Sequence, residues 1–263
     1  MARELRGVSI GSDQVDSLVA ALDLIRSGTA RTRPELAHQA SLGRALVAQR
    51  VAQLIDLGLV VEGDLGPSTG GRAPRQLRFR AEAGHVLVAE LGATSVSAGV
   101  ANLAGQLLAY REEPLDVASG PERCLRRVED IFTDVLADPN VGEAPVWGVG
   151  VGVPGPVEFA TGRPTAPPIM PGWDDYPIRE RFSARYDVPV WVDNEVNVMA
   201  LGELRAGSAR GQREVLYVKI GTGIGAGLIA DGRLHRGSQG CAGDIGHVAV
   251  VDDDTVICRC GNR

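Results

Sequence analysis

A glycine-rich turn between two strands constrains the fold of this chain more than any other feature. The stretch "LYVKIGTGIGAGLIA" at residues 216–230 places Gly221, Thr222 and Gly223 between two apolar runs of strand length. The dinucleotide-binding fingerprint requires a helix directly after its glycines, so this spacing excludes that motif. Glycines let backbone amides approach a phosphate closely, and we therefore predict a phosphate-contacting hairpin here.

A second stretch of the same kind lies earlier in the chain. In "GHVLVAELGATSVSAGV", residues 84–100, two predicted strands flank a turn of small residues, with Glu90, Gly92 and Thr94 as candidate phosphate or nucleotide contacts. A plain β-meander remains the alternative for this stretch alone. Two such hairpins in one chain are typical of the duplicated actin-like ATPase architecture.

Polar residues stand where another predicted strand passes into a helix. In "VPVWVDNEVNVMALGEL" the strand breaks at Asp193, Asn194 and Glu195. Open α/β sheets place their ligand chemistry at the carboxyl ends of strands. Asn194 can donate to and accept from sugar hydroxyls, and Glu195 can act as a general base. Simple helix capping by Asp193 or Asn194 is the alternative.

The first 80 residues have the pattern of three helices followed by a hairpin. Apolar residues with helical spacing predict a first helix that Ser12 caps and Gly28 ends. Thr32 and Glu35 fit a capping box that starts a short second helix. In a third helix, Val47, Val51 and Leu54 are expected to face inward.

Two β-prone runs, residues 59–62 and 76–80, then flank a Gly/Pro/Ser loop, which is a hairpin pattern. Three helices and a hairpin predict a winged helix-turn-helix, whose third helix lies in the DNA major groove. Arg44 suits guanine and Gln49 suits adenine. The predicted DNA contacts are Arg44, Ala45, Ala48 and Gln49 in the third helix and Arg72 and Arg75 in the wing.

The charge distribution singles out the same segment. Residues 1–80 contain 11 Arg and 8 Asp or Glu, whereas residues 81–263 contain 16 basic and 25 acidic residues. A basic head on an acidic body indicates that nucleic acid, if bound, is bound by the head. The alternatives are a chance excess of charge and a helical bundle used for protein contact. Lys219 is the only lysine, a bias that we attribute to the base composition of the gene.

Composition is that of an ordinary globular protein, with 44% hydrophobic and 23% charged residues. No apolar run approaches the roughly 18 residues of a membrane span, and no signal peptide opens the chain, so we expect a cytoplasmic protein without a membrane partner. Four cysteines, two of them in Cys-x-Cys, suit a reducing compartment and a metal site. His247, Cys258 and Cys260 are the predicted zinc ligands, one fewer than structural zinc normally takes.

Together these motifs resemble the ROK family (repressors, open reading frames and sugar kinases) over nearly the whole chain. The stretches that carry the resemblance are "GGRAP", "ELGATS", "GVGVPGPVE", "PPIMPGW", "VDNEVNVMALGE", "GTGIGAGLIADGRLHRG", "GCAGDIGH" and "CRCG". The resemblance implies an α/β fold: a winged helix-turn-helix at 1–80, then an actin-like ATPase (ribonuclease H-like) domain with its first lobe at 84–195 and an incomplete second lobe at 196–263. A winged helix before this body resembles the repressor branch, because ROK sugar kinases generally lack it.

The resemblance also implies how the zinc loop ends. In the family it reads roughly Cys-x-Cys-Gly-x-x-Gly-Cys-x-Glu, and "CRCGNR" follows this pattern up to the last residue. The fourth ligand would lie beyond Arg263, so we expect a C-terminally truncated chain with an incomplete zinc site. Cys241 is a possible substitute ligand, although a small buried cysteine is the expectation there.

Three carboxylates depart from the pattern of family kinases. Glu195 stands where these kinases have the Asp that takes a proton from the sugar hydroxyl. In the first phosphate motif Glu90 replaces the common Asp, and in the Gly-Glu-x-Gly-His motif Asp244 replaces the usual Glu. A displacement of about 1 Å can cost ~10²-fold in rate. We therefore expect weak or no phosphotransfer, with Glu195 as a degenerate catalytic base. An active sugar kinase using ATP and Mg²⁺ is the alternative, and a fragment without regulated function is another.

The predicted function is repression of sugar metabolism by a homodimer or higher homo-oligomer bound to operator DNA. The effector would be a sugar or sugar phosphate. Its predicted contacts are Asn194, Glu195, Asp244 and His247.

Overall fold

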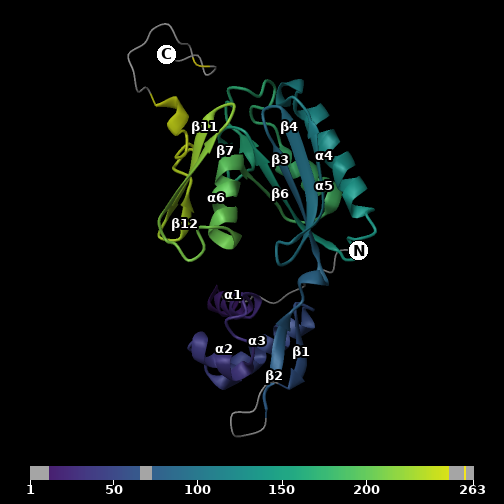
Figure 1. Ribbon diagram of the computed structural model, residues 1–263, viewed down its shortest axis with the longest axis vertical. Helices are drawn as coiled ribbons and strands as arrows, with labels where there is room; N and C mark the ends of the chain where they lie inside the picture. The colour runs from purple at the N-terminus through teal and green to yellow at the C-terminus, as the bar shows by residue number, and fades with distance from the viewer. Residues whose placement is uncertain (1–11, 66–72, 249–257, 259–263) are drawn as a thin grey trace. The chain divides into compact units, whose positions relative to one another are not determined.

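The computed structural model describes residues 12–65, 73–248 and 258 (Figure 1). The chain divides into two compact units. The N-terminal unit comprises Met1–Gly84 with Asn102–Gln106, and the C-terminal unit comprises His85–Ala101 with Leu107–Arg263. None of the helices within the described residues has both the length and the apolar character that crossing a bilayer demands.

The N-terminal unit contains the three helices and the hairpin that the sequence predicts. They are α1 (Ser12–Arg26), α2 (Arg33–Gln39), α3 (Arg44–Asp56), β1 (Val60–Leu65) and β2 (Arg75–Phe79). The two strands pair antiparallel. Its assignment as a winged helix-turn-helix stays a prediction.

Local chemistry and one small core explain these helices. The Thr32 hydroxyl accepts from the Glu35 amide at 3.3 Å, and the Glu35 carboxylate accepts from the Arg31 amide at 2.8 Å. The return bond of the predicted capping box therefore reaches one residue further back than the motif requires. On α3 the three residues expected to face inward are buried, and they join Leu36, Leu59 and Leu77 in one core.

The C-terminal unit is built on a five-stranded sheet with the strand order β5-β4-β3-β6-β9. Strand β6 runs parallel to both β3 and β9, so the carboxyl ends of these three strands lie at one edge. The strands are β3 (His85–Leu91), β4 (Ser95–Asn102), β5 (Leu107–Pro114), β6 (Val146–Val153) and β9 (Val190–Asn194).

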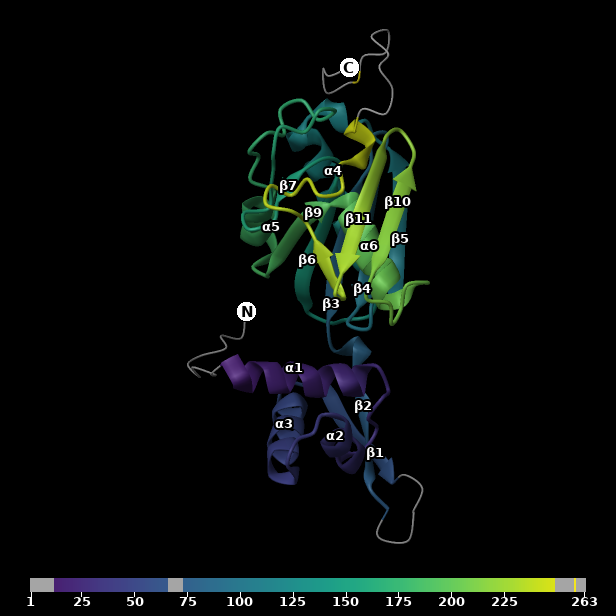
Figure 2. The ribbon, with the colours of Figure 1, turned by 90° about the vertical axis from the view of Figure 1, so that its left-hand side faces the viewer.

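Helices cover both faces of this sheet (Figures 1 and 2). On one face lie α4 (Pro121–Leu136) and α5 (Ile178–Tyr186), joined by an edge-to-face contact between Phe132 and Phe182 with centroids 6.0 Å apart. On the other face lies α6 (Glu195–Ala206). A short hairpin, β7 (Val157–Glu158) with β8 (Arg163–Pro164), follows β6.

A second, three-stranded antiparallel sheet packs on the far side of α6. It consists of β10 (Val215–Ile220), β11 (Ile224–Ala230) and β12 (Arg233–His235). Two glycines permit this contact, since a Cβ at Gly225 would lie 3.1 Å from Val196 Cγ2 and one at Gly227 would lie 2.9 Å from the Val196 carbonyl oxygen. The hairpin predicted from the glycine-rich turn is therefore the β10–β11 pair.

Candidate functional site

A pocket of about 310 Å³ lies in the C-terminal unit, where β9 passes into α6 and β10 turns into β11. Its walls bring together residues that are far apart in the sequence. Among the lining residues are the four predicted sugar contacts, two predicted phosphate contacts and two predicted zinc ligands, of which His247 is also a predicted sugar contact: Asn194, Glu195, Asp244, His247, Thr222, Gly223 and Cys258.

Asn194 is the N-cap of α6. Its Oδ1 accepts from the amides of Val196 at 2.8 Å and Asn197 at 3.3 Å. Its Nδ2 donates to the Gly155 carbonyl at 3.0 Å and to Glu195 Oε2 at 3.1 Å. An amide side chain has two donors and two acceptor lone pairs, and all four are used here. The capping role that the sequence left open is therefore present, and Asn194 can meet a ligand only by exchanging one of these bonds.

Glu195 is the most perturbed carboxyl group of the pocket. Its side chain is 12% exposed, and burial raises its pKa to about 7, against the opposing effect of the Lys219 ammonium. Lys219 Nζ lies 3.6 Å from Glu195 Oε1 and 3.7 Å from Glu90 Oε1. A carboxyl with a pKa near neutrality can exchange a proton with a bound hydroxyl, which is what a general base requires.

Asp193, one residue earlier, serves the structure of the pocket. It is buried and accepts from Arg236 Nε at 2.8 Å and Nη2 at 2.7 Å, and from Asn197 Nδ2 at 2.9 Å. The Arg236 guanidinium also stacks over the Phe159 ring at 3.7 Å. This ion pair ties the segment after β12 to the end of β9, and it thereby holds the segment that leads to Asp244.

The fit of zinc can be tested on two of the three predicted ligands. His247 Nδ1 lies 3.7 Å from Cys258 Sγ. Two such ligands of one tetrahedral zinc ion are about 3.6 Å apart, so this pair fits the metal. Cys260 lies outside the described residues, and within those residues no group of three or more candidate ligands is found. Cys241 is exposed, contrary to the buried position expected for it.

The predicted phosphate contacts are only partly in place. Glu90, near the end of β3, forms an ion pair with Lys219. The amide of Gly92 donates to the Ser95 carbonyl at 2.8 Å, and that of Gly221 donates to the Gly223 carbonyl at 2.9 Å. These two amides are used inside their own turns. Thr94 is exposed, and it does not line the pocket.

The predicted DNA contacts that the structure describes lie on the surface of the N-terminal unit. Arg44, Ala45, Ala48 and Gln49 are exposed on α3, and Arg75 is exposed at the start of β2. Arg72 falls outside the described residues. By contrast, Arg50 on α3 is buried and donates to Ser17 Oγ and Gln53 Oε1, both at 2.8 Å, so it belongs to the core of the unit.

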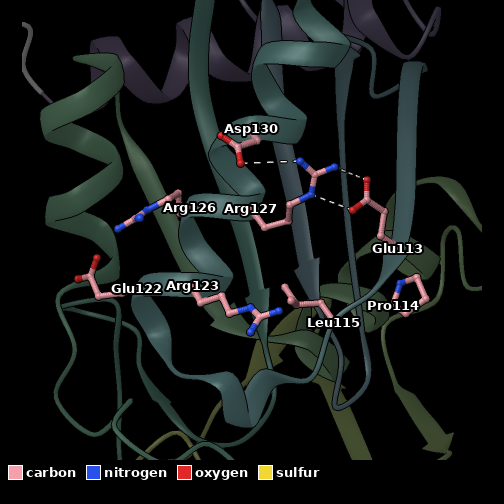
Figure 3. Close-up of a pocket in the computed structure, with 8 residues that line it drawn as sticks. All are labelled: Glu113, Pro114, Leu115, Glu122, Arg123, Arg126, Arg127 and Asp130. Atoms are coloured by element: carbon pink, nitrogen blue, oxygen red, sulfur yellow. Dashed lines mark hydrogen bonds and ion pairs between the residues drawn. The ribbon is translucent and has the colours of Figure 1, made fainter.

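Another cleft, of about 530 Å³, lies between β5 and α4 (Figure 3). Its central cation, Arg127, donates to both carboxylate oxygens of Glu113 and lies 3.7 Å from Asp130. The cleft contains none of the predicted site residues. The pocket at the strand ends brings together predicted site residues from distant parts of the sequence, and we therefore favour it.

Sequence reasoning named Asp193 as part of the polar run at the end of the strand, but it missed the partner Arg236 and it missed Lys219 as a pocket residue. Lys219 carried a signal, because it is the only lysine in a chain of 27 basic residues and stands just before the glycine-rich turn. Arg236 carried none, since its partner Asp193 is 43 residues away.

Comparison with known proteins shows the family to which the chain belongs. The family model described as "ROK family" matches residues 86–263. The chain belongs to the ROK family. A xylose repressor of Caldicellulosiruptor bescii is 32% identical over 236 residues, which cover 88% of this chain and 57% of the repressor. The chain thus spans little more than half the length of this relative.

Two solved structures show how the fold is shared. A ROK family transcriptional regulator, a homologue of the Escherichia coli MLC protein, matches 94% of this chain and 63% of its own with a TM-score of 0.75 at 23% identity. A ROK family glucokinase from Streptomyces griseus, solved with glucose and AMPPNP, matches 68% of this chain and 55% of its own with a TM-score of 0.58 at 28% identity. The ROK body is therefore an α/β fold common to regulators and kinases.

Proposed function

We propose that this protein is a DNA-binding transcriptional repressor of sugar metabolism whose pocket senses a sugar or sugar phosphate. The proposal is best supported by how much of the chain matches a repressor and how much matches a kinase. The match to the xylose repressor covers 88% of the chain and so extends beyond residues 86–263 into the N-terminal unit. The match to the glucokinase structure covers 68%.

The N-terminal unit would read the operator as a winged helix-turn-helix. Its exposed α3 face carries one guanidinium and one amide, the groups that pair with guanine and adenine in the major groove. Arg72 and Arg75 would contact phosphate or the minor groove from the wing. A homodimer would place two α3 helices in successive major grooves of a near-palindromic site.

The pocket would hold the effector against Glu195, Asp244 and His247, with Asn194 positioning Glu195. A ligand shifts the protein between operator-binding and released states only through its different affinity for the two states. Zinc, bound by His247, Cys258 and Cys260, would fix the short segment Ile245–His247, whose last residue lines the pocket. This would couple the metal to the sensor.

Fluorescence anisotropy on the gene's own upstream DNA, at several salt concentrations, tests the proposal. We expect tight, salt-dependent binding that the double variant Arg44→Ala/Gln49→Ala loses. Arg26→Ala is the matched control, because Arg26 pairs with Asp23 on α1 and lies outside the predicted face. Equal binding of native and scrambled DNA would contradict operator recognition.

A sugar kinase is the second candidate, and the raised pKa of Glu195 favours it. A coupled assay with ATP, Mg²⁺ and hexoses separates the two functions. A turnover near or above about 1 s⁻¹, which Glu195→Gln abolishes, would assign the chain as a kinase. Sugar-dependent release from DNA without turnover would support the repressor.

A further inference from the structure

The pocket contains a cation of its own. The Lys219 ammonium, on β10, lies within 3.7 Å of carboxylate oxygens from two other elements, Glu90 on β3 and Glu195 at the start of α6. No other lysine occurs in the sequence, in which the remaining basic residues are arginines. An ammonium is a compact point charge, whereas a guanidinium is a broad planar fork, so the ammonium suits the small space between two converging carboxylates.

Two carboxylates that converge on one point are the usual ligands of a divalent cation. Magnesium is what ATP-dependent phosphotransfer would bring to this fold. The residues present do not fit it, because the position between Glu90 and Glu195 is already held by Nζ of Lys219. A metal ion bound to both carboxylates would have to lie beside that ammonium and would be repelled by it.

We propose that Lys219 is the built-in counter-ion of the pocket and that it excludes divalent cations from the Glu90–Glu195 pair. Lys219 is therefore a specificity-determining residue: the pocket takes a ligand that needs no metal ion, and a magnesium nucleotide finds no anchor on these carboxylates. This inference rests on the geometry of the pocket and does not depend on operator binding.

Manganese binding, measured by the loss of the electron paramagnetic resonance signal of free Mn²⁺, tests the inference on the zinc-loaded protein. Lys219→Met removes the charge and keeps most of the length. We expect this variant to gain one Mn²⁺ site with at least about tenfold higher affinity than wild type, which would correspond to a change of about 1.4 kcal/mol. Lys219→Arg keeps the charge and should gain no site.

Two further variants assign the site. Lys219→Met/Glu90→Gln should lose the gained Mn²⁺, because one of its two carboxylates is removed. Glu90→Gln in the wild-type background should leave Mn²⁺ binding unchanged, and this measurement needs no lysine variant to fold. A wild-type Mn²⁺ site that Glu90→Gln abolishes would overturn the proposal. So would a Lys219→Met protein that melts like wild type and gains no Mn²⁺ at a pH above the pKa of Glu195, where both carboxylates are ionised.

Discussion

The two sheets of the C-terminal unit differ in how they are covered. The five-stranded sheet has helices on both faces, and the main core cluster of the described residues, from Leu87 to Val192, consists of this sheet, its helices and connecting loops. The three-stranded sheet packs one face on α6. The opposite face of this sheet is uncovered within the described residues. On β10 it carries three apolar side chains with large exposed fractions: Leu216 at 63%, Val218 at 42% and Ile220 at 80%.

This difference in coverage indicates that one sheet mainly stabilises the unit and the other mainly forms the pocket. Apolar burial is the dominant favourable contribution to folding, so the five-stranded sheet carries most of the stability of this unit. The three-stranded sheet contributes little core but supplies one wall of the pocket, through Lys219 and the turn that follows it. Truncations in the core of the first sheet should therefore cost the most stability, whereas in the second sheet only substitutions at its contact with α6 should cost stability and the others should act on the pocket.

The largest effect is expected for Phe132→Ala in α4. Phe132 is fully buried and its ring meets those of Phe182 and Tyr186 at centroid distances of 6.0 and 5.9 Å. Truncating a buried Phe costs about 3–5 kcal/mol of unfolding free energy through lost transfer energy and the cavity left behind. Urea unfolding followed by circular dichroism measures it. The exposed control Leu216→Ala should change the value by less than about 0.5 kcal/mol, and equal losses in the two variants would refute the comparison.

A pH-dependent effect of roughly 3 kcal/mol is expected at the pocket itself. The folded state raises the pKa of Glu195 from 4.5 to about 7, so it favours the protonated form. This contribution is fully present below pH 4.5 and is lost as pH rises to about 7, since a shift of one unit corresponds to about 1.4 kcal/mol. Wild type should therefore lose stability relative to Glu195→Gln between pH 5 and pH 8. Urea unfolding at a series of pH values measures this difference. If the unfolding free energies of the two proteins changed with pH in parallel, the pKa of Glu195 would not be raised by burial.

Gly227→Ala probes the contact between α6 and the three-stranded sheet. The added Cβ would lie 2.9 Å from the Val196 carbonyl oxygen, and overpacking of this kind costs about 1–3 kcal/mol. Gly202→Ala, on α6 itself, is the matched control, because nothing lies within 4 Å of its added Cβ. That control should be neutral or stabilise the helix by up to about 1 kcal/mol. Thermal melting compares the two, and a stable Gly227→Ala protein would mean that the sheet can move away from α6 freely.

The smallest effect on stability is expected for Ile220→Ser, on the uncovered face of β10. Its side chain is 80% exposed, so the unfolding free energy should change by less than about 0.5 kcal/mol. Solubility should rise, because an apolar edge strand is a template for aggregation. Light scattering during a concentration series measures this. A large loss of stability would show that the face is covered in solution.

Features set by neighbours in the chain could be predicted from the sequence. Thr32 with Glu35 marked the start of α2, the glycine-rich turn marked the β10–β11 hairpin, and the Asp-Asn-Glu run marked the end of β9. Each depends on backbone conformation and capping within a few residues, which local residue types determine. The sequence therefore located the elements, and it named seven residues that line one pocket.

Only the tertiary structure decided what those residues face. Asn194 caps α6 and donates a hydrogen bond to Glu195. The residue type alone does not predict which of these partners an asparagine has. Lys219 meets Glu90 and Glu195 because β10, β3 and α6 converge, and burial then sets the protonation of Glu195. Burial and ion pairing between distant segments depend on how sheets and helices pack, and no spacing along the chain encodes that packing.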